Sequence, residues 1–173
     1  FTPVKRVPEL PNLAELDLSG SEITDLSSLS KLVQLRRLDL GETEVVDIRP
    51  LTTLKELTLL RLDATEVEDG QPLAALPHLN ELDLRKSPLY DLAFLAKCRA
   101  LRNLSISDCD RLSDLTKAPN LRSVKCGPII VDDPLVLRNC KRLEFLMVAG
   151  HLDKGVKQEL GLALPGCEIV TQW

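Results

Sequence analysis

A leucine pattern recurs along this sequence with a period of 22 residues, and this repeat constrains the fold more than any other feature. The first leucine of each unit falls at Leu13, Leu35, Leu57, Leu79, Leu101, Leu121 and Leu143, which gives steps of 22, 22, 22, 22, 20 and 22 residues. A fixed period of about 20 to 50 residues is typical of solenoids and related repeat architectures. We therefore expect seven similar units stacked along one axis.

Each unit contains two kinds of apolar spacing. Leu38 and Leu40 alternate with charged residues, which predicts a short strand with one buried face. Ile48 and Leu51 follow three residues apart, which fits a short helical or 3₁₀ return segment. A unit therefore reads as one strand followed by one return.

The segment LRRLDLGETEVVDIRPLTTL, residues 35–54, resembles the leucine-rich repeat of the short, internalin-like kind, and the pattern covers nearly the whole chain. Repeat five, with Cys109, Leu112 and Asp114, is closer to the cysteine-containing type of this repeat. The resemblance implies an α/β fold, a right-handed solenoid with seven to eight parallel strands in a concave sheet and short 3₁₀ or helical returns on the convex side.

The chain divides into three predicted parts. Residues 1–12 read as the second half of an upstream repeat or the remnant of an N-terminal cap, residues 13–150 as seven repeats, and residues 151–173 as a C-terminal cap. Val156, Leu160 and Leu164 have helical spacing in that cap, and the segment 167–170 could add a last strand. The first residue is Phe and the only methionine is Met147, so we expect the start of the natural chain to be missing.

Composition narrows the classes of partner. The formal net charge of −4 gives no nucleic-acid footprint, and no apolar run is long enough to predict a membrane span. Aromatic residues make up only 3% of the chain, so leucine must fill most of the core. A protein partner is the expectation, with self-association as a possibility.

Histidines and cysteines give no sign of catalysis. His78 and His151 have no nearby nucleophile motif, and we expect both on the surface, with no enzyme activity, cofactor or metal. The five cysteines, an odd count without a C-x-x-C pair, are most simply buried thiols, with disulfides or a zinc site as the alternative. Buried thiols favour a reducing, cytoplasmic location.

One aspartate recurs per turn of the predicted solenoid, at Asp25, Asp47, Asp69, Asp91 and Asp114. Oxygen ligands from neighbouring turns could form a ladder for divalent cations. The favoured interpretation is that each carboxylate caps the return segment that begins just after it, because a local need repeated in every turn explains the column without any metal.

The strand positions that alternate with the buried leucines point toward the concave side, and these positions define the candidate binding surface. Its members are charged over the first four strands and apolar over the seventh: Arg37, Asp39, Leu59, Arg61, Asp63, Glu81, Asp83, Arg85, Phe145 and Met147. Arg37, Arg61 and Arg85 are the preferred anchors, because arginine is enriched at binding hot spots. An ion-pair ladder through Arg61, between Asp39 and Asp83, and a merely solvated face are the competing interpretations.

The resemblance implies a non-catalytic protein-interaction module that serves as scaffold, sensor or targeting domain of a larger protein. Three alternatives stay open. The chain could be a regulatory segment packed against a catalytic or nucleotide-hydrolysing domain of its own protein, a pathogen effector or surface-adhesion module, or a self-associating structural module. Fold analogy alone does not separate them.

Overall fold

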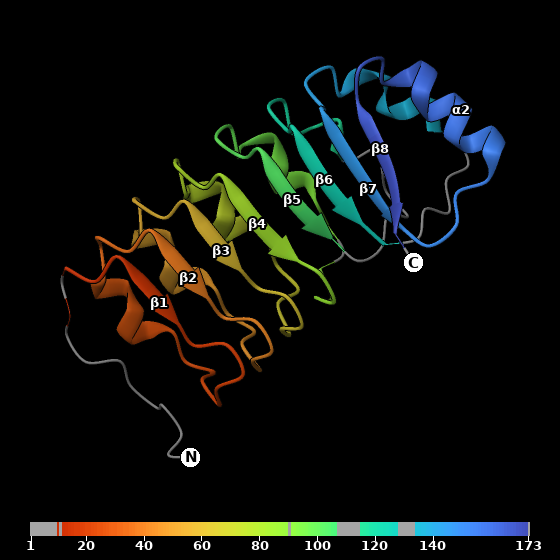
Figure 1. The fold of residues 1–173 in the computed structure, drawn as a ribbon. Coiled ribbons are helices and arrows are strands. Elements are labelled where there is room, and N and C mark those ends of the chain that lie inside the picture. The colour runs from red at the N-terminus through yellow and green to blue at the C-terminus, as the bar shows by residue number, and fades with distance from the viewer. Residues whose placement is uncertain (1–9, 11, 90, 107–114, 128–133, 173) are drawn as a thin grey trace.

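The computed structural model describes residues 10, 12–89, 91–106, 115–127 and 134–172. Eight strands form one sheet in chain order from β1 to β8, and each strand pairs in parallel with the next (Figure 1). The strands are β1 (Glu15–Asp17), β2 (Arg37–Asp39), β3 (Leu59–Arg61), β4 (Glu81–Leu84), β5 (Asn103–Ile106), β6 (Ser123–Cys126), β7 (Phe145–Ala149) and β8 (Glu168–Gln172). The predicted parallel sheet is confirmed at the upper end of its expected strand number.

The sequence period sets the register of the sheet. Leu38 of β2 pairs with Leu60 of β3, and Leu60 pairs with Leu82 of β4, so equivalent places of successive repeats lie side by side. The shortened fifth repeat keeps this register, because Leu104 still pairs with Val124 although only 20 residues separate them. The missing two residues are therefore absorbed outside the strands.

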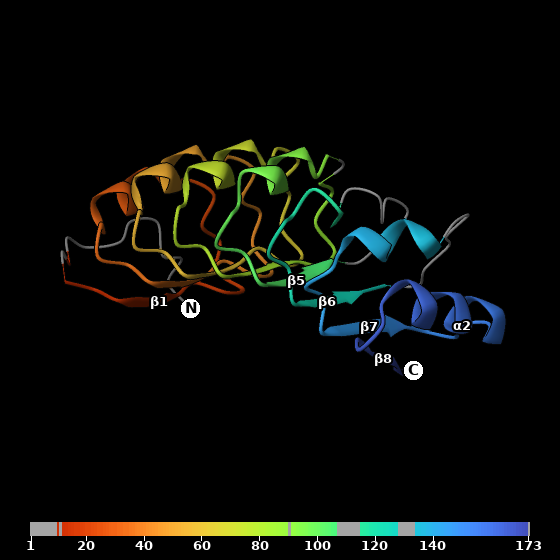
Figure 2. The same cartoon turned by 90° about the horizontal axis from the view of Figure 1, so that it is seen from above.

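Return segments form the opposite wall of the solenoid. They are the 3₁₀ helices η1 (Ser27–Lys31), η2 (Arg49–Thr53), η3 (Gln71–Ala75), η4 (Ala93–Ala96) and η5 (Pro134–Asn139). Figure 2 shows them on the outside of a gentle arch, with the strands along its inner side. The strand wall is thus the concave one, as predicted.

The recurring aspartates cap the return helices wherever the structure describes them. Asp25, Asp47, Asp69 and Asp91 each accept a hydrogen bond, at 2.8 to 2.9 Å, from the backbone N–H two residues later, at the first residue of η1 to η4. This bond satisfies one of the free donors of a helix start. The capping interpretation is confirmed for these four, and Asp114 lies outside the described residues.

Each of the first four strands ends in a turn of left-handed backbone conformation. The residues at this place are Gly20 (φ 64°), Glu42 (φ 57°), Ala64 (φ 53°) and Lys86 (φ 58°), one per turn. Only glycine adopts this conformation without steric cost. The turn is held by neighbours such as Thr65, whose buried hydroxyl donates to the Leu62 carbonyl oxygen at 2.7 Å.

Leucine fills most of the core, but in the third repeat a glycine stands at one of the buried apolar positions. Gly70 occupies the place that holds Leu26, Ile48 and Leu92 in other turns, and Phe94 of the next turn fills the vacated volume. A Cβ on Gly70 would lie only 2.5 Å from the Phe94 ring, which is itself 1% exposed. One of the few aromatic side chains therefore substitutes for a missing branched one.

The C-terminal segment contains helix α2 (Lys154–Ala163) and strand β8. Asp153 caps α2 by accepting from the Gly155 backbone N–H at 2.7 Å, and Leu160 is fully buried. The helix packs against η5, while β8 continues the sheet beyond β7 (Figure 1). The predicted helical spacing is confirmed, and the possible last strand is present as β8.

Candidate functional site

Two shallow hollows run along the concave strand wall and contain most of the predicted binding residues. The larger, about 590 Å³, is lined by Ser19, Gly20, Asp39, Gly41, Glu42, Arg61, Asp63, Glu81, Asp83, Arg85, Ser105, Lys125 and Met147. The smaller, about 290 Å³, adds Glu15, Leu16, Asp17, Arg37, Leu38 and Leu59 and shares Asp39 and Arg61 with the first. Of the ten predicted residues, only Phe145 lines neither hollow.

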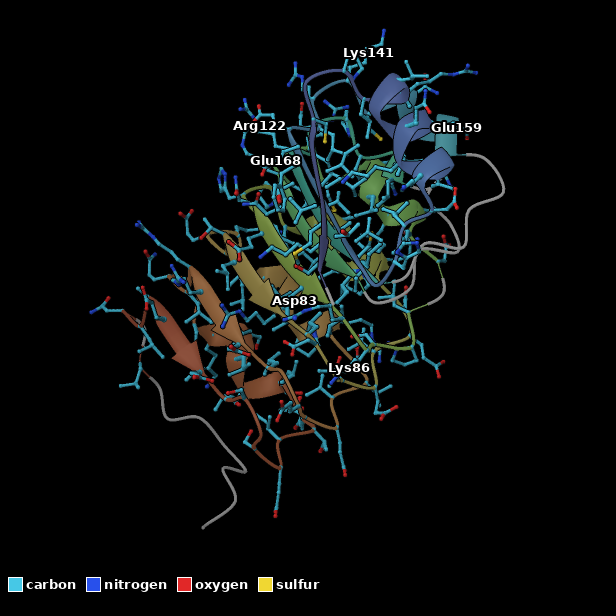
Figure 3. All side chains as sticks on the ribbon, turned by 45° about the vertical axis from the view of Figure 1, so that its right-hand side comes forward. Asp83, Lys86, Arg122, Lys141, Glu159 and Glu168 are labelled. Carbon is cyan, nitrogen blue, oxygen red and sulfur yellow. The ribbon has the colours of Figure 1, made fainter. Side chains whose placement is uncertain are left out.

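The parallel register explains why these residues converge. Side chains at alternate places of a strand point to the same face, and the 22-residue step repeats that place on every neighbouring strand. In Figure 3, Asp83 of β4 lies midway along this wall. Glu42, Ser105 and Lys125 also line the larger hollow but were not among the candidates; the strand register would have indicated Ser105 and Lys125, since they occupy the same column as Asp83.

Two of the three predicted arginine anchors already have carboxylate partners within the chain. Arg61 donates through Nη1 to Asp39 Oδ2 at 3.0 Å, and Arg85 donates through Nη2 to Asp83 Oδ2 at 2.6 Å. Asp83 is taken by Arg85, which lies two residues later in the chain. The ladder through Arg61 therefore reaches Asp39 and does not extend to Asp83 as a hydrogen bond. These pairs fix both guanidinium groups in place on the wall.

Arg37 differs from the other two arginines. Its Nε lies 4.0 Å from Glu15 Oε1, at the outer limit of an ion pair, whereas Arg61 and Arg85, which are similarly exposed, make hydrogen-bonded pairs. Exposed pairs of this kind contribute little to stability. Arg37 is therefore the most available of the three cations for a partner.

Asp63 is the carboxylate in the larger hollow with the least favourable surroundings. Burial raises the pKa of Asp63, repulsion from Asp83 raises it further, and nearby Arg85 only partly offsets these effects. A Cβ on Gly41 would lie 2.8 Å from Asp63 Oδ1 and 3.2 Å from Asp39 Oδ1, so the two carboxylates crowd over the bare glycine backbone. The middle of the hollow therefore has an excess of negative charge.

The apolar members of the wall are less open than predicted. Leu59, Phe145 and Met147 are each half-buried, whereas the exposed large apolar side chains among the described residues are Leu10, Val33, Val46 and Leu162. The expectation of an exposed apolar patch on β7 was wrong, because β8 lies beside β7 and places Val170 opposite Met147. An aliphatic end of the hollow remains at Met147.

Three of the five thiols and both imidazoles lie where the sequence predicted. Cys98, Cys126 and Cys140 are buried and unpaired, Cys167 is half-buried, and Cys109 lies outside the described residues. Burial raises the pKa of Cys98 and Cys140 to about 11, so neither thiol ionises readily near neutral pH. His78 and His151 are both exposed.

Among the described residues no group of three or more His, Cys, Asp or Glu side chains could hold a metal ion, despite the carboxylates on the wall. No helix within the described segments is both long and apolar enough to cross a membrane.

The chain resembles known repeat proteins in sequence and structure. Residues 11–53 match the family model for leucine-rich repeats, in two copies. Internalin C2 of Listeria monocytogenes is 23% identical, with a TM-score of 0.75 over 93% of this chain and 72% of that one. A leucine-rich-repeat protein of Leptospira interrogans is 18% identical, with a TM-score of 0.65 over 95% of this chain and 51% of its own.

A plant structure extends the range of similar folds. The leucine-rich-repeat ectodomain of the Arabidopsis thaliana membrane receptor kinase GASSHO1/SCHENGEN3, solved in complex with CASPARIAN STRIP INTEGRITY FACTOR 2, is 22% identical, with a TM-score of 0.61 over 91% of this chain and 21% of that one. This chain thus spans about half of the Leptospira protein and about a fifth of the receptor ectodomain. None of the curated proteins matches the sequence significantly.

Proposed function

Because residues 11–53 match the leucine-rich-repeat model and the chain has the leucine-rich-repeat fold, we propose that it is a non-catalytic protein-interaction module that binds a protein partner on its concave wall. The observation that carries the proposal is the larger hollow, which follows the wall from the turn after β1 to β7 and is lined mainly by charged and polar side chains. An extended, open surface of this kind fits a protein chain better than an enclosed small molecule.

The electrostatics of the wall support recognition of a polar protein surface. Arg61 and Arg85 are held by neighbouring carboxylates, so binding does not have to immobilise these two long side chains. Arg37 on β2 and Glu81 on β4 are exposed and present charges of opposite sign on either side of Leu59. Such mixed charge favours specificity and fast association more than raw affinity.

The proposal also includes the role of the chain within a larger protein and the cellular compartment in which it acts. This chain spans only part of two of the similar structures, which supports a role as scaffold, sensor or targeting domain within a longer protein. The plant receptor ectodomain was solved in complex with CASPARIAN STRIP INTEGRITY FACTOR 2, which supports partner binding by this fold in that protein. Three buried, unpaired cysteines support an intracellular, reducing compartment for this one.

A charge-changed wall provides the test. The variant Arg37→Glu, Glu81→Arg and Lys125→Glu alters three exposed side chains of the wall and leaves the Arg61 and Arg85 ion pairs in place. Both the wild type and this variant are used as bait in lysate from the native cells, and a retained protein is then purified and titrated by calorimetry. We expect binding to weaken by about tenfold or more on the variant, as is typical when exposed interface charges are reversed together.

A matched control separates the wall from general charge effects. The variant Arg36→Glu, Lys55→Glu and Glu56→Arg carries the same net charge change outside both hollows. It should bind the partner within about twofold of the wild type, because none of its three residues lines either hollow and salt screens exposed charges that do not touch the partner. Equal loss of binding by both variants, or loss by the control alone, would refute the concave site.

A further inference from the structure

The edge of the sheet where the strands begin carries a concentrated set of cations. Along this edge the Arg102 N–H donates to the Asn80 carbonyl oxygen at 2.9 Å, and the Arg122 N–H donates to the Arg102 carbonyl oxygen at 2.8 Å, so equivalent places stack turn upon turn. Just before strands β5, β6 and β7 this strand-start edge exposes Lys97, Arg99, Arg102, Arg122, Lys141 and Arg142.

Few carboxylates offset this positive charge. Glu144 pairs with Arg122 at 2.8 Å, and Glu168, whose backbone N–H donates to the Glu144 carbonyl oxygen, lies opposite Phe145 on the next strand. Figure 3 places Arg122 and Lys141 together at this edge, with Lys86 at the opposite one. The strand-start edge of β5 to β7 is therefore a basic surface.

The opposite edge, where the strands end, carries the complementary charge in the first three repeats. Two columns of exposed carboxylates follow the 22-residue step there: Glu22, Glu44 and Glu66, and Asp25, Asp47 and Asp69. Arg49 offsets one of them through its 2.7 Å pair with Asp47. The strand-end edge of repeats one to three is therefore an acidic surface.

These two surfaces cannot neutralise each other within one molecule. About six residues of extended chain separate Arg36 at one edge from Glu42 at the other, which corresponds to roughly 20 Å. The basic surface also lies several strands further along the solenoid than the acidic one. At physiological salt, charges further apart than about 8 Å are largely screened.

We propose that the basic strand-start edge of β5 to β7 docks against the acidic strand-end edge of repeats one to three of a second copy of this chain. Six cations then face six carboxylates in a staggered, head-to-tail contact. This surface is distinct from the concave wall and goes beyond the binding function proposed above. Because the contact joins unlike edges, it leaves one basic and one acidic edge free and can add further copies.

A nucleic acid fits the basic edge less well than a second copy. Proteins that hold single strands combine cations with exposed aromatic stacking platforms, whereas Phe145, the aromatic residue that begins β7 beside this edge, is half-buried. A second copy, in contrast, presents carboxylates in columns with the same strand-to-strand spacing as the cations they meet. The charge pattern of the chain itself thus supplies the matching surface.

Sedimentation equilibrium of the chain at about 0.05 M and about 0.5 M NaCl tests the proposal. We expect the average mass to rise with protein concentration at low salt, and the association constant to fall by about tenfold or more at high salt. The basic-edge variant Arg99→Glu, Arg102→Glu, Lys141→Glu and the acidic-edge variant Glu22→Lys, Glu44→Lys, Glu66→Lys should each stay monomeric. Circular dichroism confirms that both remain folded.

Mixing the two variants gives the decisive measurement. Each reversed edge now matches the reversed edge of the other variant, so the mixture should form a salt-sensitive complex that neither variant forms alone. A wild-type chain that stays monomeric at low salt, or a mixture that does not associate, overturns the proposal. Salt-sensitive binding of poly(A) RNA that is lost only in the basic-edge variant, without self-association, would assign the edge to nucleic acid instead.

Discussion

The Gly70 and Phe94 pair gives a prediction in which the same substitution has opposite effects at two glycines. Gly70 has ordinary helical backbone angles, φ −88° and ψ −4°, so alanine is not excluded by conformation. Its added Cβ would instead lie 2.5 and 2.6 Å from two atoms of the buried Phe94 ring. We expect Gly70→Ala to lower the free energy of unfolding by about 1–3 kcal/mol, the usual cost of overpacking a core.

Gly161 provides the control. It lies within α2, and a Cβ there would meet no atom within 4 Å. Gly161→Ala should therefore stabilise the chain by about 0.5–1 kcal/mol, because alanine restricts the unfolded chain and favours helix. Urea unfolding followed by circular dichroism measures both changes.

A double-mutant cycle tests the cause. Phe94→Ala alone should cost about 3–5 kcal/mol by leaving a cavity. In that background the Gly70→Ala methyl enters free space, so the double variant should be more stable than the sum of the single costs predicts, by about 1 kcal/mol or more. Strictly additive costs, or a neutral Gly70→Ala, would refute the assignment of Phe94 to the space left by Gly70.

Three electrostatic and capping predictions and one backbone prediction follow from the same structure. The folded state raises the pKa of Asp63, so the charged form of this carboxyl is disfavoured, and Asp63→Asn should raise the melting temperature at pH 7. This gain should vanish as the pH falls below 3.8, the ordinary pKa of an aspartate, because the carboxyl is then neutral in both states. A gain that persists at low pH would contradict the electrostatic cause. Cys98 and Cys140 have pKa values raised to about 11, so both thiols should resist iodoacetamide at pH 8 until urea unfolds the chain. Mass spectrometry measures the labelling of each cysteine, and rapid labelling of the native chain would argue against their burial. Asp69→Ala should cost about 0.5–2 kcal/mol in urea unfolding by removing a helix cap, whereas Asp69→Asn should cost less. Ala64→Gly should stabilise the chain by roughly 1 kcal/mol in the same assay, because its φ of 53° favours glycine.

Much of the candidate site followed from the repeat, because period and side-chain alternation together fix which residues share a face. Arg37, Asp39 and Arg61 were expected on one wall, and the structure places all three along the smaller hollow. The exposure of Phe145 and Met147 was misjudged, since it depends on the strand that lies beside β7.

The sequence by itself determined the parallel sheet, its register and the capping aspartates of the first four turns, since each of these depends on a spacing that repeats every 22 residues. Only the tertiary structure decided which carboxylate each arginine takes. It also decided how Phe94 fills the space beside Gly70 and how two oppositely charged edges lie on one molecule. The physical reason is that repeat spacing sets backbone position, whereas contacts between turns depend on side-chain rotamers and volumes that differ from one repeat to the next.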